Sequence, residues 1–207
     1  MQNLDPNFIA SLQATREIGI APVYFVWIEA TNRSTGATET MGLWSGDEDI
    51  AQNVRTPTGG LATREYLGRV NLSVADLKLV ADLTDEPVTV SMSQIADATQ
   101  QLVRGYDVRL AYCEIHATSR VGGVFSSAPQ LQFVGIVDDL KIGTPQVGGE
   151  GSIGLVVRSE LMTQLLSTNP AKSSDSHQKR RQANDRFSEY SGTVQARKVQ
   201  WYYKKQD

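Results

Sequence analysis

Short apolar runs with strand periodicity recur along the chain and limit the folds that it can adopt. Residues 22–28 (PVYFVWI) are rich in β-branched and aromatic side chains, which predicts a strand covered on both faces. Turn residues at 32–36 (NRSTG) precede a second run at 41–44, and the two runs predict a hairpin. Later alternating residues predict further strands: Val108, Leu110 and Tyr112; Leu131, Phe133 and Val137; and Ile153, Leu155 and Val157.

One amphipathic helix interrupts these strands. A capping box of Ser91 and Gln94 is predicted to open it, and Arg104 and Gly105 close its last turn. Many strands at short spacing with a single central helix predict a mainly β (α+β) fold, a β-barrel or sandwich with one packed helix, rather than a parallel α/β fold. The apolar stripe that would pack on the sheet consists of Ile95, Ala98, Leu102 and Val103.

Other segments of the first half have less regular patterns. An N-terminal helix is predicted to begin at residues 5–6 (DP) and to end near Gly19. The polar residues 45–60, broken by proline and glycine, predict a long loop, which in a compact domain usually makes contacts or carries a site. Short strands are predicted at 64–72 and 79–83.

The composition changes after Leu166. Residues 167–186 contain almost no large apolar side chain, so they cannot bury a core of their own. Phe187 and Tyr190, and then Val199, Trp201 and Tyr203 at strand spacing, predict a return to a packed surface. We therefore expect a domain at residues 1–166 and a C-terminal extension at 167–207, made of a polar arm and a return strand.

The bulk composition excludes several classes of protein. A hydrophobic fraction of 40% predicts a folded chain, and a net charge of -3 gives no overall attraction for nucleic acid or anionic lipid. The single cysteine, Cys113, excludes an intrachain disulfide and any multi-thiolate metal site. The N-terminus lacks the pattern of a cleaved signal, and the longest apolar stretch is far shorter than a membrane helix. The sequence predicts a soluble protein.

Residues that could support catalysis are scattered. Asp138 and Asp139 are adjacent, so without a bulge a strand would point them to opposite faces. The loop residues 47–49 (DED) lack the glycine and distal glutamate of a calcium loop. A hydrolase that uses Asp138, Asp139 or Glu114 stays open as an alternative.

Histidine, cysteine and glycine motifs add no site. His116 and His177 are the only histidines, and neither has the spacing of a paired metal ligand. Cys113 has no base placed beside it, and a buried cysteine most often behaves as a small apolar residue. No nucleophile elbow, phosphate-binding loop or dinucleotide fingerprint occurs. We predict no catalytic residue, no metal and no cofactor, so the chain is not expected to be an enzyme.

A local basic concentration stands out in this acidic chain. It spans residues 179–181 (KRR), with Lys172, Arg186, Arg197 and Lys198 around it. Nucleic-acid binding is one interpretation, but Asp175 and Asp185 lie within the stretch and no aromatic residues alternate with the basic ones. Docking on an acidic neighbouring subunit is the prediction that we favour. The predicted assembly interface consists of His177, Gln178, Lys179, Arg180, Arg181, Asp185 and Arg186.

The order of the segments resembles the tail-tip hub proteins of long-tailed bacteriophages and gene transfer agents. The segments are residues 70–117, with a helix followed by R-G-x-D at 104–107 and a strand; 132–142, with a G-x-[IVM]-D turn at 135–138; 154–170; and 174–201. Each motif is weak, and their order carries the resemblance. The C-terminal pattern of the family is matched by His177, Gln178, Arg180, Arg181, Asp185, Phe187, Val199 and Trp201.

The resemblance implies a fold and a role. Family members have a β-barrel or sandwich of tail-tube type, and their hubs are homotrimers that join the six-fold tail tube to the three-fold tip around a channel through which DNA passes. The implied partners are the distal tail ring, the central fibre or tip protein and the tape measure, in the virion and, during assembly, in the host cytoplasm. Members similar to the lambda minor tail protein L hold an iron–sulfur cluster near the C-terminus; this chain has no cysteine there, so no cluster is implied.

Two other functions stay open at this point. A distal tail ring protein would have the same general composition and differ in stoichiometry. A β-sandwich that recognises a host glycan through residues 45–60 and Trp44 is the alternative from the class of binding modules.

Overall fold

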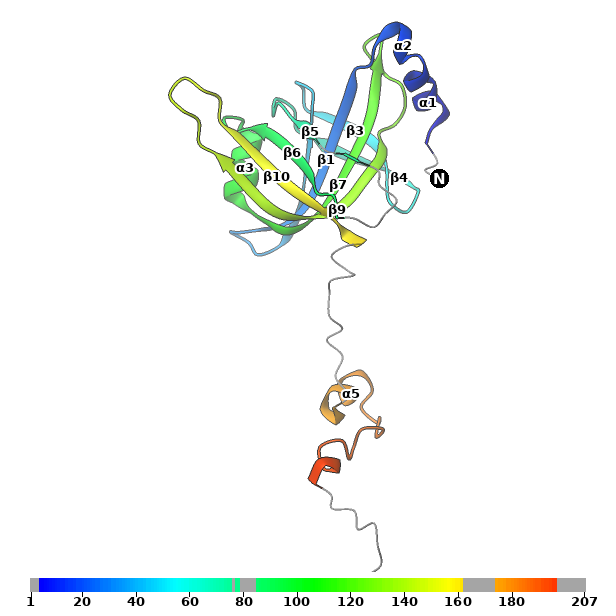
Figure 1. Ribbon diagram of the computed structural model, residues 1–207, viewed down its shortest axis with the longest axis vertical. Helices are drawn as coiled ribbons and strands as arrows, with labels where there is room; N and C mark the ends of the chain where they lie inside the picture. Colours follow the sequence, from blue (N-terminus) through cyan, green and yellow to red (C-terminus); the bar gives the residue numbers. More distant parts are fainter. Residues whose placement is uncertain (1–3, 76, 79–84, 162–173, 197–207) are drawn as a thin grey trace, which may run out of the picture. The chain divides into compact units, whose positions relative to one another are not determined.

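The computed structural model describes residues 4–75, 77–78, 85–161 and 174–196. The chain forms two compact units, Met1–Leu166 and Ser167–Asp207. The first unit is built on a curled half-barrel sheet, which confirms the predicted mainly β (α+β) fold class (Figure 1).

Eight strands of the described residues form the curled sheet, in the spatial order β2-β1-β7-β9-β10-β6-β5 with β8 paired to β7. Every neighbouring pair is antiparallel, and β1, β7, β9 and β10 run side by side through its centre (Figure 1). The strands are β1 (Pro22–Asn32), β2 (Thr38–Trp44), β5 (Ser73–Ala75), β6 (Val88–Ser93), β7 (Tyr106–Val121), β8 (Val124–Phe125), β9 (Gln130–Gly143) and β10 (Ser152–Ser159).

Helices cover parts of this sheet. The predicted N-terminal helix is present as α1 (Pro6–Gln13) and α2 (Thr15–Ile18); the Asp5 side chain caps α1, and Gly19 ends α2 with a φ of 78°. The central helix α3 (Asp97–Gly105) starts later than predicted. Ser91 belongs to strand β6, so the predicted capping box is wrong, and Ile95 of the predicted apolar stripe is 82% exposed.

The main core lies on the inner face of the curl. Alternate residues of the sheet strands point into it because successive side chains of a strand face opposite sides. Leu102 of α3 is fully buried in the same core, so this helix packs on the sheet as predicted. The largest fully buried members are Ile28, Leu43, Met92, Leu102, Ile115, Ile153 and Leu155.

The segment between β4 (Leu61–Tyr66) and β5 links β2, at one edge of the curled sheet, to β6 near the other edge. The Leu67 N–H donates to the Gly42 carbonyl at 2.9 Å, and the Leu67 carbonyl accepts from the Trp44 N–H at 3.1 Å on β2. Farther along, the Val70 carbonyl accepts from the Ser93 N–H at 2.8 Å on β6. Val70 is fully buried, so this segment adds to the core where the half-barrel is open.

A separate hairpin covers the outer face of β1 and β7. It consists of β3 (Ile50–Arg55) and β4 (Leu61–Tyr66), so the prediction of one long loop at residues 45–60 is wrong. The large apolar residues of β3 are Ile50 and the fully buried Val54, and most of the other residues are polar. This composition resembles that of a loop. A second core forms beneath the hairpin from Val23, Phe25, Trp44, Val54 and Tyr66.

Irregular pairing in the sheet changes one predicted pattern. The predicted alternation places Leu110 on one strand face with Val108 and Tyr112, but Leu110 has a φ of 62° and is 69% exposed, whereas Val108 is buried. The register between β1 and β7 shifts there, so Ala111 is buried instead. Such a bulge moves the following residues to the other face.

The predicted G-x-[IVM]-D turn is also corrected. Gly135 lies inside β9, paired with Cys113 of β7 and Ser159 of β10, so no turn occurs at 135–138. A Cβ atom at this glycine would lie 2.1 Å from the Arg158 carbonyl oxygen. The glycine therefore allows a close approach of two strands.

Candidate assembly surfaces

The residues predicted for assembly lie on and directly after α5 (Asp175–Arg181), in the second unit. The basic residues are exposed, whereas the other predicted residues are half-buried. The exposed ones are Lys179, Arg180, Arg181 and Arg186, and the half-buried ones are His177, Gln178 and Asp185.

The basic residues of α5 do not form one face. Consecutive residues of an α-helix point about 100° apart, so Lys179, Arg180 and Arg181 spread around the helix end. They occupy the last turn, where positive charge interacts favourably with the helix dipole. Lys179 pairs with Asp175 at 2.8 Å, while no carboxylate in the described residues lies within ion-pair distance of Arg180 or Arg181. These two guanidinium groups are available to a partner.

Large apolar side chains are exposed beside this basic helix. Phe187 is 91% exposed, Tyr190 70% and Val194 65%. Phe187 and Tyr190 therefore form no packed surface within the second unit, and Ser188 is the only buried residue among those of 174–196 whose side chains the structure describes. Too few apolar residues surround these rings to form a core. Val199, Trp201 and Tyr203 lie outside the described residues.

A groove runs between the N-terminal helices and the β7–β8 turn of the first unit. Its volume is about 610 Å³, and we call it the α1 groove. Small and apolar residues dominate its lining, and Arg120 is the only charged residue among the described residues that line it. Sequence reasoning missed this groove because it requires α1 to pack beside a strand that is distant in sequence. Its lining is Asn7, Ala10, Ser11, Ala14, Gly19, Ile20, Ala21, Arg120, Val121, Gly122 and Ser126.

Charged residues are also buried beneath the β3–β4 hairpin. The Arg64 guanidinium of β4 donates to both carboxylate oxygens of Glu114 on β7, at 2.6 and 3.3 Å, and lies 4.6 Å from the centroid of the Trp27 ring. The side chain of Glu114 is only 3% exposed, so its charge requires this partner. Sequence reasoning missed the pair because Arg64 and Glu114 are 50 residues apart.

His116 extends the buried polar layer. Its Nε2 atom lies 3.0 Å from the Arg55 carbonyl oxygen of β3 and 3.4 Å from the Glu114 carboxylate. Burial lowers the pKa of His116 to about 4, and the Arg64 charge acts in the same direction, so the ring is neutral near pH 7. Burial likewise raises the pKa of the Cys113 thiol to about 12, which keeps it protonated and unreactive.

The carboxylates considered for hydrolysis do not meet. Asp138 lies at a register shift between β9 and β10 and pairs with Arg158 at 2.9 Å. The neighbouring Asp139 accepts a hydrogen bond from the Leu140 N–H at 2.8 Å. Glu114 is buried against Arg64. The geometry of these three carboxylates fits structural ion pairs and hydrogen bonds rather than an acid–base pair around a substrate.

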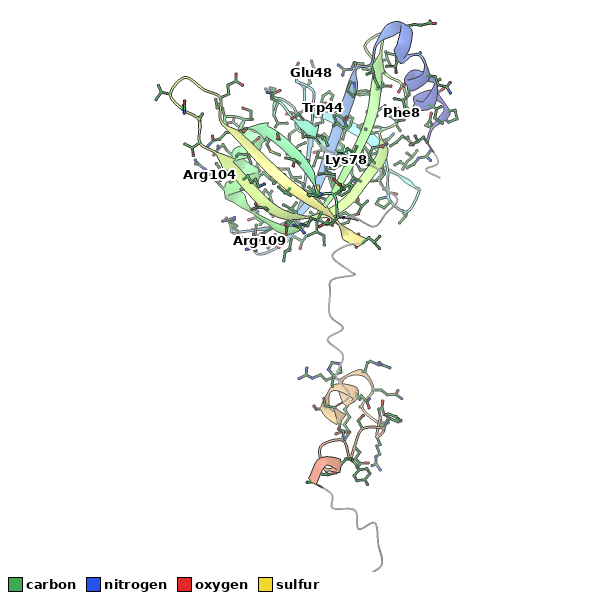
Figure 2. All side chains as sticks on the ribbon, viewed as in Figure 1. Phe8, Trp44, Glu48, Lys78, Arg104 and Arg109 are labelled. Carbon is green, nitrogen blue, oxygen red and sulfur yellow. The ribbon has the colours of Figure 1, made fainter. Side chains whose placement is uncertain are left out.

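The glycan-binding alternative loses the residue on which it depended. Trp44 is only 3% exposed and stacks on Phe25, with ring centroids 5.5 Å apart. Its indole N–H donates to the carbonyl of Glu48 at 2.6 Å, and Figure 2 labels both residues on the same part of the first unit. A sugar-binding tryptophan presents its ring face to solvent, which this ring does not do.

Among the described residues, no group of three or more His, Cys, Asp or Glu side chains is arranged to hold a metal ion. No helix of the described residues is long and apolar enough to cross a membrane. When the sequence was compared with known proteins, no protein-family model and no curated protein matched it.

Proposed function

We propose that this chain is a structural subunit of a phage tail tip, a hub that joins the tail tube to the tip or central fibre and lines the DNA channel. Its function is carried by interfaces, without a catalytic site. The observation that carries the proposal is the surface of the second unit, where Phe187, Tyr190 and Val194 are exposed beside a basic helix. Contiguous exposed apolar residues with polar neighbours are typical of protein–protein contacts.

Three further observations support this assignment. The R-G-x-D passage on which the family resemblance rests coincides with the junction of α3 and β7, at Gly105 and Tyr106. Apolar cores pack on both faces of the sheet, so the first unit should keep its shape when it forms part of a ring. A net charge of -3 weakens adhesion to DNA in transit.

Native mass spectrometry of the purified chain, alone and with the neighbouring tail proteins, tests the proposal. A homotrimer, or three copies in each complex, is the expected result. Six copies would favour a distal tail ring protein. A chain that stays monomeric and binds none of the distal ring, fibre and tape-measure proteins would remove the structural assignment.

The basic helix offers a specific test within the same assay. Replacing Lys179, Arg180 and Arg181 together by glutamine should weaken binding to an acidic neighbour, because electrostatic steering and pairing are lost. The matched control is Arg109→Gln, which removes an exposed charge from β7 of the first unit. Equal effects of the two changes would contradict an assembly role for α5.

A further inference from the structure

The Arg120 side chain lines the α1 groove and has no carboxylate partner among the described residues. The Arg120 guanidinium lies 5.1 Å from the Phe125 ring centroid and 5.9 Å from that of Trp44. In the part of the chain that the structure describes, no carboxylate lies within ion-pair distance of it. Stacking on these rings fixes the position of the guanidinium, so it presents a pre-oriented positive charge at the groove.

The rest of the lining sets the other requirement for an occupant. Ile20 is 46% exposed and Val121 49% exposed, so the groove offers apolar surface to solvent. The hydroxyls of Ser11, Ser119 and Ser126 already bond to one another, which holds α1 against β7 and leaves them satisfied. A volume of about 610 Å³ is within the range of pockets that bury most of a ligand. An occupant should combine apolar side chains with one carboxylate.

Residues 187–190 of the chain have this chemistry. Phe187 and Tyr190 are the large exposed side chains, and the exposed Glu189 lies between them in the sequence. No ion pair of Glu189 occurs among the described residues. Among the described residues, the segment thus has an unpaired carboxylate and two exposed rings. The groove has an unpaired guanidinium and apolar walls.

We infer that the α1 groove of one copy receives residues 187–190 of a second copy, with Glu189 paired to Arg120 and the two rings covering Ile20 and Val121. The inference rests on the proposed function and identifies the partner surface. Two aromatic side chains each bury about 150–250 Å², enough to anchor a contact. A head-to-tail exchange, in which each copy gives one segment and receives another, closes into a ring when the rotation fits.

A disulfide experiment tests the contact between copies. Full-length chain carrying Val121→Cys is mixed in its assembled state with chain carrying Ser191→Cys, and the mixture is oxidised. A covalent pair of the two chains is expected, and the native Cys113 does not compete because it is fully buried. Each chain holds one new cysteine, so a bond between the two new cysteines can join only separate copies.

The control is Leu61→Cys, an exposed position on β4 that does not line the groove, mixed with the same Ser191→Cys chain. Equal yields from the Leu61 and Val121 positions would show random collision and overturn the inference. No bond from Val121→Cys would overturn it as well.

Charge reversal supplies an independent test. Arg120→Glu or Glu189→Arg alone should weaken assembly by about tenfold, and the two together in one chain should restore it, because opposite charges again face each other. Arg109→Glu is the matched control, an exposed arginine of the same strand β7, and Figure 2 shows Arg109 at the opposite end of the unit from Phe8 of α1. Single reversals that act no more strongly than this control, or a double reversal without rescue, would disprove the pairing.

The outcomes separate this inference from the proposed function. A trimer or a three-copy complex that forms normally with both single reversals keeps the hub and removes the groove contact. A wild-type chain that assembles with nothing removes both.

Discussion

Single residues beneath the β3–β4 hairpin show how strongly this fold depends on paired charges. Arg64 binds both oxygens of Glu114 and contacts the Trp27 ring, while His116 links the same carboxylate to the Arg55 backbone. The Glu114 charge is acceptable inside the protein because the Arg64 guanidinium satisfies it. The hairpin is therefore attached by an apolar core and by a polar layer that fails if one member is removed.

Arg64→Ala should lower the free energy of unfolding by about 3–5 kcal/mol, because it leaves the Glu114 charge buried without its partner. Urea unfolding followed by tryptophan fluorescence measures the change. Replacing both residues together, Arg64→Leu with Glu114→Met, should recover most of the loss, since no buried charge remains. A single substitution that costs less than about 1 kcal/mol, the range of surface pairs, would show that Glu114 is solvated.

His116 predicts a loss of stability on acidification. Its pKa is lowered by burial from 6.5 in the unfolded chain to about 4 in the folded one, so the unfolded chain binds the proton first as the pH falls. The contribution of neutral His116 is complete above pH 6.5 and is lost between 6.5 and about 4. Because one pKa unit corresponds to about 1.4 kcal/mol, the loss is on the order of 3 kcal/mol.

Denaturant unfolding from pH 7.5 to 4.5 measures this dependence. The slope should be reduced in His116→Gln and kept in His177→Gln, since His177 lies on α5 of the second unit. The same slope in wild type and His116→Gln would assign the acid sensitivity to other groups.

At the scale of the elements, a glycine in the sheet determines how closely two neighbouring strands can lie. Gly135 is placed where β9 meets the backbone of β10, and a Cβ atom there would lie 2.1 Å from the Arg158 carbonyl oxygen. Gly154 of β10 is in ordinary surroundings, because its Cβ would lie 3.9 Å from the nearest side-chain atoms. Two glycines in adjacent strands thus have different roles.

Gly135→Ala should destabilise the protein by about 1–3 kcal/mol because the two strands must move apart. Gly154→Ala should be neutral or slightly stabilising, since alanine loses less conformational freedom on folding. Thermal or urea unfolding of the pair gives the comparison. Equal effects at the two positions would show that β9 and β10 relax freely.

Local patterns explain which elements could be predicted from the sequence. The run at 22–28, the hairpin after it and Ile153, Leu155 and Val157 of β10 follow simple periodicity, and their strands form as predicted. The incorrect predictions concern segments whose structure depends on other parts of the sequence. β3 is a strand because β4 pairs with it, and Ser91 belongs to β6 because β10 lies beside it.

The candidate surfaces were only partly predictable. Basic charge marked α5 in the sequence, since a run of like residues is visible without a fold. The α1 groove and the Arg64–Glu114 pair could not be seen, because each joins elements far apart in the chain.

For the whole molecule, the division into two units separates the apolar cores from the segment that we propose for assembly. The first unit contains both apolar cores, and the described residues of the second leave their large apolar side chains exposed. Stability should therefore reside in the first unit, whereas partner binding should also require the second.

A chain ending at Leu166 should fold with an unfolding free energy close to that of the full chain, because both cores remain intact. It should fail to assemble, because α5 and residues 187–190 are missing. Urea unfolding and native mass spectrometry of the truncated chain test the two halves of this prediction. The matched control is full-length chain with Phe187→Ser and Tyr190→Ser, which keeps the length and should also assemble poorly, since the exposed rings are lost. A truncated chain that unfolds would place part of the stability in residues 167–207, and one that still assembles would move the interface to the first unit.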